Sequence, residues 1–120
     1  MLDFARVSLD SPPPYRRVSF DLEAGQIHGI AFGDPARPPD IDFLHATGFN
    51  ALTYRTLLAP LALRFSVLAV DLRGHGRTTL PPRLFGYASW NRHRDDVIDL
   101  LERHIQVPVT LAGHSMGATT

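Results

Sequence analysis

The stretch from residue 107 to residue 117, VPVTLAGHSMG, joins a run typical of a buried β-strand to a short glycine-flanked turn that holds a serine. We predict a strand over residues 107–112, because a continuous apolar run suits a strand buried on both faces of a parallel sheet. The turn after it matches the spacing G-x-S-x-G. This spacing is typical of a strained strand-to-helix turn that exposes the serine oxygen, where bulky flanking residues would clash. The alternative is a glycine–serine turn that only links a strand to a helix.

Upstream of this turn, strand patterns and helix patterns alternate. Alternation of apolar and polar residues predicts a hairpin over 17–23 and 26–32, and apolar runs predict strands over 41–44 and 65–70. Helical spacing predicts helices over 51–62 and 89–104, the first ended or kinked near Ala59 by Pro60. The expected apolar stripes are Tyr54, Leu57, Leu58 and Leu61 on the first helix, and Trp90, Val97, Ile98, Leu101 and Ile105 on the second. Together these elements predict an α/β fold with a parallel sheet.

Three glycine-containing loops follow predicted strands, at residues 45–48, 71–76 and 113–117. Ligands of open parallel sheets bind outside the carboxyl ends of the strands. We therefore expect these three loops to converge on one site.

The composition excludes several classes of function. Twelve basic and 12 acidic side chains give a net charge of zero, which provides no basic footprint for nucleic acid or an anionic membrane. There is no cysteine, so disulfides and thiolate metal sites are excluded. No apolar run is long enough to span a bilayer, and the start of the chain lacks the pattern of a secretory signal, so we expect a cytoplasmic protein. We expect one domain over residues 16–120, preceded by a proline-rich tail over residues 1–15.

Three motifs, in this order and spacing, resemble the N-terminal half of an α/β-hydrolase of the serine-nucleophile branch. They are HATG at 45–48, DLRGHGRT at 71–78 and LAGHSMGA at 111–118. The resemblance covers about residues 16–120. It implies a partial α/β-hydrolase sheet, with an N-terminal antiparallel hairpin followed by parallel strands and crossover helices, truncated after the nucleophile elbow. It also implies that the strand before HATG lies beside the strand before the serine.

The resemblance assigns roles around the serine. It implies that Ser115 is the nucleophile and that Gly113, His114 and Gly117 shape the elbow around it. The backbone N–H of Met116 would be one donor to the oxyanion.

The resemblance also assigns roles in the HATG loop. The second oxyanion donor would be the backbone N–H of Thr47. Gly48 is the alternative donor, because Ala46 stands where relatives usually have glycine. His45 and His114 would support their loops rather than act as the general base.

The acid and the base of a catalytic triad are expected elsewhere. In this family they follow the serine in the chain, whereas residues 116–120 contain neither an acid nor a histidine. Asp71 and His75 lie on one tight loop, which does not suit an acid that must orient a histidine toward serine, so we expect them, with Arg73, to shape that loop. We therefore expect an incomplete hydrolase whose 120 residues are inactive alone. The alternative is a non-catalytic α/β module, or a half-domain that a partner chain completes.

The resemblance implies acyl chemistry without a cofactor or a metal ion. A serine at the nucleophile position excludes relatives that attack with a carboxylate, which leaves esters, thioesters, lactones or C–C cleavage of diketones. The expected partner is a small-molecule acyl substrate.

Overall fold

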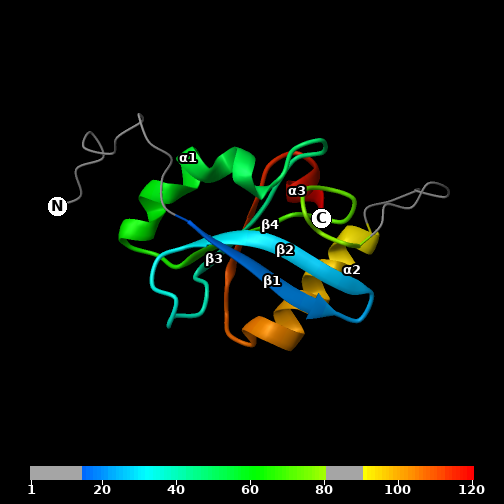
Figure 1. Ribbon diagram of the computed structural model, residues 1–120, viewed down its shortest axis with the longest axis horizontal. Helices are drawn as coiled ribbons and strands as arrows, with labels where there is room; N and C mark the ends of the chain where they lie inside the picture. The colour runs from blue at the N-terminus through cyan, green and yellow to red at the C-terminus, as the bar shows by residue number, and fades with distance from the viewer. Residues whose placement is uncertain (1–14, 81–90) are drawn as a thin grey trace.

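The computed structural model describes residues 15–80 and 91–120. Its five strands form one sheet in the order β1-β2-β4-β3-β5. Figure 1 shows β1 and β2 side by side in this sheet. The strands are β1 (Arg16–Leu22), β2 (Gly25–Phe32), β3 (Ile41–Leu44), β4 (Val67–Val70) and β5 (Thr110–Gly113). All but the last residue of the predicted tail, together with Ser89 and Trp90 of the second predicted helix, lie outside the described residues. Within the described part of the chain, no helix is both long and apolar enough to cross a membrane.

The sheet is mixed, as the sequence predicts for a partial α/β-hydrolase. β1 and β2 form the antiparallel hairpin, and β2 also runs antiparallel to β4. β3 runs parallel to both β4 and β5, between which it lies. The strand before HATG therefore does lie beside the strand before the serine, and the ends of both strands bring their loops together.

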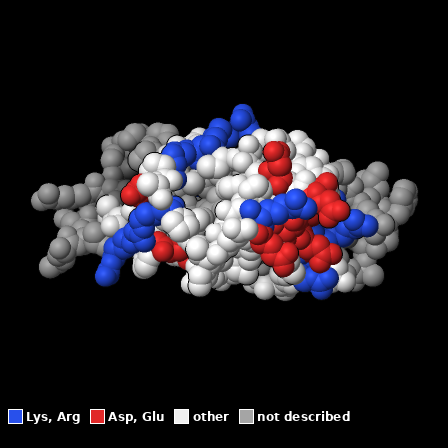
Figure 2. Space-filling view, turned by 90° about the horizontal axis from the view of Figure 1, so that it is seen from below, with Lys and Arg blue, Asp and Glu red and all other residues white. Residues whose placement is uncertain are grey.

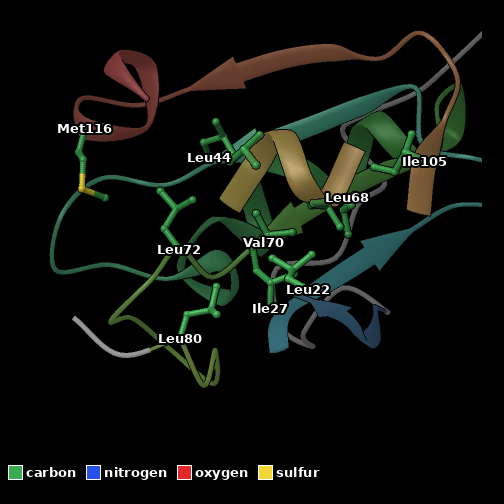
Figure 3. Close-up of a cluster of buried hydrophobic side chains, with 11 residues drawn as sticks. Leu22, Ile27, Leu44, Leu68, Val70, Leu72, Leu80, Ile105 and Met116 are labelled. Atoms are coloured by element: carbon green, nitrogen blue, oxygen red, sulfur yellow. The ribbon is translucent and has the colours of Figure 1, made fainter. Parts of the chain in front are cut away.

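Two hydrophobic clusters cover the two faces of the sheet. β4 contributes alternate residues to both, because successive side chains of a strand point to opposite faces. Leu68 and Val70 join a cluster that includes Val97 and Leu100 of α2 (Asn91–Leu100). Figure 3 shows this cluster, with Met116 at one end tying the start of the last helix to it. All four β4 residues are buried, which confirms the prediction of a strand covered on both faces.

Two predicted strands are shorter than expected. β4 begins at Val67 and not at 65, and β5 begins at Thr110 and not at 107. Phe65 and Val107, the apolar residues that extended the predictions, are both exposed. Pro108 has no N–H to donate to a strand ladder, which fits the late start of β5. The expectation that β5 is buried is wrong, since Leu111 is 50% exposed on a strand that pairs only with β3 among the described strands.

The first predicted helix is a composite of short turns that cover the other cluster. It consists of the 3₁₀ turn η2 (Ala51–Tyr54), α1 (Arg55–Leu58) and the 3₁₀ turn η3 (Ala59–Leu63). The break at Ala59 confirms the effect expected of Pro60, which lies in the first turn of η3. The predicted stripe is wrong at Leu57, which is 66% exposed. A 3₁₀ turn has about three residues per turn, so the inward face follows Ala51, Tyr54 and Leu58 instead.

The second helix continues past α2 as the π turn η4 (Leu101–Ile105). Val97 and Ile105 are buried as predicted, and Leu101 packs partly buried against them. The prediction is wrong for Ile98, which is 44% exposed. The buried face of α2 instead includes two polar side chains, His93 and Asp96.

Candidate active site

The turn after β5 holds Ser115 in a strained backbone conformation. Ser115 has φ 54° and ψ −112°, and it directly precedes α3 (Met116–Thr119). Only two described residues other than glycine have positive φ, and the other one is Gln106. Positive φ disfavours any residue with a Cβ, so the surrounding turn must hold Ser115 in place. Ser115 is an exposed residue of this turn.

The glycines on either side of Ser115 are needed for space. A Cβ on Gly117 would overlap the carbonyl oxygen of Leu44, at the end of β3. A Cβ on Gly113 would lie 2.5 Å from the backbone nitrogen of Ala118. The turn can therefore close only where both flanking residues lack a side chain, which is the physical basis of the G-x-S-x-G spacing.

The first residue of α3 has an available backbone donor. Gly117 N–H donates to the carbonyl of His114, and Ala118 N–H donates to that of Ser115, each at 3.0 Å. Within residues 15–80 and 91–120, no group accepts a hydrogen bond from Met116 N–H. This amide, next to the exposed residue Ser115, is free to receive a hydrogen-bond acceptor.

The loop after β3 has one available amide between two that are engaged. Ala46 N–H donates to Tyr54 Oη and Gly48 N–H donates to His75 Nε2, both at 3.1 Å. Thr47 N–H has no acceptor among the described residues. Thr47 N–H and Gly48 N–H, the two alternatives that the sequence leaves open, therefore differ in their hydrogen bonding.

Two histidines fasten the loops to their surroundings. His45 is fully buried, its Nδ1–H donates to the Ala46 carbonyl at 2.7 Å, and its Nε2 accepts from Leu72 N–H at 2.9 Å. Burial lowers the pKa of His45 below the ordinary value of 6.5, so the ring is neutral at pH 7. His114 Nδ1 and Tyr54 Oη share a hydrogen bond of 2.9 Å. Tyr54 therefore bridges the loop after β3 and the residue before Ser115.

The loop after β4 is held by its own carboxylate. Asp71 accepts from Ala51 N–H at 2.8 Å and from Arg77 N–H at 3.0 Å. A Cβ on Gly76 would overlap this carboxylate. His75 is occupied at both ring nitrogens, with Nδ1 2.9 Å from the Arg73 carbonyl and Nε2 accepting from Gly48 N–H. Asp71 and His75 thus serve the loops, and they do not form an acid–histidine pair directed at Ser115.

The three loops meet as the sequence predicts, and the structure adds two residues that sequence reasoning missed. Tyr54 was expected only as an apolar contact, although its hydroxyl is the one polar group on that predicted stripe. The sequence does not distinguish Asp96 from the other charged residues of α2, whereas in the structure it is buried and forms an ion pair with Arg73. No simple spacing relates Asp96 to Arg73.

A separate groove lies along α2. Its volume is about 560 Å³, and its lining includes Glu23, Asp95, Asp99 and Glu102. Figure 2 shows acidic side chains gathered on this face of the molecule. Ser115 and Thr47 are not among the lining residues, so the groove is distinct from the elbow. The described residues hold no cluster of three or more histidine, aspartate or glutamate side chains that could bind a metal ion.

Comparison with known proteins identifies the relatives of this chain. Residues 43–120 match the model of the alpha/beta hydrolase family. An uncharacterized protein of Mycobacterium tuberculosis is 34% identical over 98 residues, which cover 80% of this chain and 28% of that protein. A pimeloyl-[acyl-carrier protein] methyl ester esterase of Chromobacterium violaceum is 35% identical over 79 residues, which cover 66% of this chain and 28% of the esterase.

A solved structure gives the same result for the fold. The structure of an E-2-(acetamidomethylene)succinate hydrolase superimposes with a TM-score of 0.75 at 28% identity. The match covers 88% of this chain and 37% of the hydrolase. The chain therefore spans little more than a quarter of the length of these two curated relatives, at 28% of each.

Proposed function

Because this chain belongs to the α/β-hydrolase family, we propose that it carries the nucleophile and the oxyanion donors of a serine hydrolase. The proposed substrate is a small ester or a related acyl compound. One observation carries the proposal: Ser115 sits exposed at φ 54° in a turn that needs glycine on both sides, next to an available amide. A backbone held in this unfavourable conformation has a physical rationale if the hydroxyl must project from the sheet.

The proposed reaction uses Ser115 as a covalent nucleophile. Its Oγ forms a bond to the carbonyl carbon of the substrate, and its proton passes to a histidine base. The carbonyl oxygen becomes an oxyanion, which accepts from Met116 N–H and Thr47 N–H. The alcohol or thiol then leaves with a proton, and water releases the acid from Ser115.

The acid and the histidine are proposed to come from the remainder of a larger hydrolase domain. The support is twofold. Family members place both groups after the nucleophile in the chain, and the two curated relatives are far longer than this chain. His45 and His75 do not fill the role, because backbone groups occupy both nitrogens of each ring.

The chemistry of the serine and the names of two relatives support the proposed substrate class. One relative is named as a methyl ester esterase, and a structural neighbour is named as a hydrolase of an acetamidomethylene succinate. A serine at the elbow is suited to attack on an acyl carbon.

The test uses the full-length protein, a p-nitrophenyl ester and a fluorophosphonate probe. We expect ester hydrolysis, covalent labelling of the peptide that contains Ser115, and a loss of kcat of at least about a thousandfold in Ser115→Ala. Ser19→Ala, which removes an exposed serine hydroxyl from β1, is the matched control and should keep full activity. Turnover that survives in Ser115→Ala would rule out the proposed nucleophile.

A second measurement concerns the origin of the acid and the histidine. The intact mass of the native protein is compared with the 13.3 kDa of this chain. A larger mass supports one continuous hydrolase domain. A mass of 13.3 kDa favours a partner chain that supplies both groups.

A further inference from the structure

The backbone amides of the loop after β3 differ in whether they donate a hydrogen bond, and side chains from two other elements cause the difference. Ala46 N–H is engaged by Tyr54 of η2, and Gly48 N–H is engaged by His75 of the loop after β4. Phe49 N–H donates to the Ala46 carbonyl at 3.1 Å, which closes the turn. Between the engaged amides of Ala46 and Gly48, Thr47 N–H has no acceptor among the described residues.

We propose that Tyr54 and His75 are positioning residues that select Thr47 N–H as the second oxyanion donor, by engaging the amides on either side of it. The inference rests on the proposed function, because it assigns a role within the same site. It adds two residues that do not touch the substrate and act only through the backbone of the loop.

The hydrogen bonds of His75 define its protonation. Nε2 accepts from Gly48 N–H, so it carries no proton, and Nδ1–H donates to the Arg73 carbonyl. The ring is therefore the neutral tautomer with its proton on Nδ1. Gly48 lies at φ +83°, and a Cβ on this residue would have no neighbour within 4 Å, so the space on that side of the loop is open. The bond to His75 supplies a restraint at that point.

His45 makes the reciprocal connection. His75 reaches from the loop after β4 to an amide of the loop after β3, whereas His45 reaches back to Leu72 N–H. The two rings meet edge to face with centroids 4.8 Å apart. The two loops are thus joined in both directions, and the position of Gly48 is set by the loop after β4.

Tyr54 connects the same loop to the elbow. Its ring packs against Phe43 with centroids 4.7 Å apart, and its side chain is buried in the hydrophobic cluster that also contains Ala51 and Leu58. Its hydroxyl accepts from Ala46 N–H and shares a hydrogen bond with His114 Nδ1. One hydroxyl therefore fixes the loop that carries Thr47 relative to the residue that precedes Ser115, and so relates the two proposed oxyanion donors.

Kinetics of the full-length protein test the two positioning roles. We expect Tyr54→Phe and His75→Leu each to lower kcat about tenfold, with KM changed less than about twofold, because a displaced donor weakens only transition-state binding. His75→Gln should recover most of the loss, since its amide oxygen can accept from Gly48 N–H. The matched controls Tyr15→Phe and His104→Leu, away from these loops, should leave kcat unchanged. Unchanged kcat in His75→Leu, or no recovery in His75→Gln, overturns the proposal.

Backbone substitution tests the selection of the amide directly. An α-hydroxy acid incorporated at position 47 or at position 48 replaces one N–H by an ester oxygen. We expect about a hundredfold loss of kcat at position 47, as for removal of one oxyanion donor, and a smaller loss at position 48. A larger loss at position 48 would assign the donor to Gly48 and overturn the proposal.

A measurement without substrate separates this inference from the proposed function. Nuclear magnetic resonance can detect the scalar coupling across the hydrogen bond between Gly48 N–H and His75 Nε2, and it can identify the Nδ1–H tautomer. We expect both signals in the wild type and neither in His75→Leu. Absence of the coupling overturns the positioning role of His75. If the coupling is present and the wild type hydrolyses no ester, the proposed function fails instead.

Discussion

At the scale of single residues, the elbow serine carries the clearest physical signature in the molecule. Ser115 has a Cβ at φ 54°, a conformation that glycine adopts freely and other residues adopt at a cost. The glycine–serine–glycine spacing predicted the turn because the backbone around Gly113 and Gly117 leaves no room for a side chain at either position. The spacing could not predict which amides are free, since that depends on Tyr54 and His75 from other elements.

This strain predicts an unusual order of stability at position 115. Ser115→Gly should be more stable than Ser115→Ala by about 1 kcal/mol. Alanine keeps the strained Cβ, whereas glycine relieves the strain. The greater conformational freedom of glycine in the unfolded chain offsets part of this gain. Denaturant unfolding of the full-length variants measures the difference. At Ser19, in the regular strand β1, the order should reverse. A Ser115→Ala variant as stable as Ser115→Gly would show that the turn is not strained.

At the scale of elements, sequence patterns located the strands well and the helical surfaces less well. Both ends of β3 were predicted correctly, because its short apolar run stops where HATG begins. Helical periodicity failed at Leu57 because η2 and η3 are 3₁₀ turns, which do not keep the spacing of an α-helix. It failed at Ile98 because α2 turns His93 and Asp96 inward, and an apolar stripe cannot reveal a polar buried face.

Strand β3, which lies between β4 and β5, contains a buried carboxyl group. Asp42 is fully buried and lies in register between Leu68 of β4 and Leu111 of β5. Among the described residues, neither carboxyl oxygen has a hydrogen-bond partner. Burial raises the pKa of Asp42 from 3.8 to about 8, because the apolar surroundings disfavour the charged form.

This raised pKa predicts stability that falls as the pH rises. Between pH 3.8 and about 8, the folded protein holds a proton on Asp42 that the unfolded chain releases. The contribution of Asp42 to the free energy of unfolding is therefore greatest below pH 3.8, and it declines by about 1.4 kcal/mol per pH unit up to pH 8. Asp42→Asn cannot ionise, so its stability relative to the wild type should increase steadily from pH 5 to pH 8.

Chemical denaturation of both proteins at several pH values measures this difference. Asp95→Asn is the matched control, because the side chain of Asp95 is 63% exposed and solvent keeps its contribution small. The wild type and Asp95→Asn should therefore differ by a nearly constant amount. A difference between the wild type and Asp42→Asn that stays constant with pH would contradict the burial of a protonated carboxyl group.

At the scale of the whole molecule, one buried ion pair joins the loop after β4 to α2. Arg73 Nε lies 2.9 Å from Asp96 Oδ2, and the second guanidinium contact to Oδ1 measures 2.7 Å. The sequence predicted that Arg73 shapes its loop, but it could not identify Asp96, which is 23 residues away on a helix rich in charge. The pair borders the acidic groove along α2. It therefore anchors the loop that carries His75 to the face of the sheet opposite η2 and α1.

Breaking this pair should destabilise the whole domain. Arg73→Met leaves the Asp96 carboxylate buried without its cation, and loss of one partner of a buried pair typically reduces the free energy of unfolding by about 3–5 kcal/mol. Arg94→Met is the matched control, since the Arg94–Asp95 pair is exposed and should contribute less than about 1 kcal/mol. The double variant Arg73→Met/Asp96→Leu should recover much of the loss, because no buried charge is then left unpaired. Denaturant unfolding measures all of these variants, and an Arg73→Met variant as stable as Arg94→Met would show that the ion pair does not hold the loop to the helix.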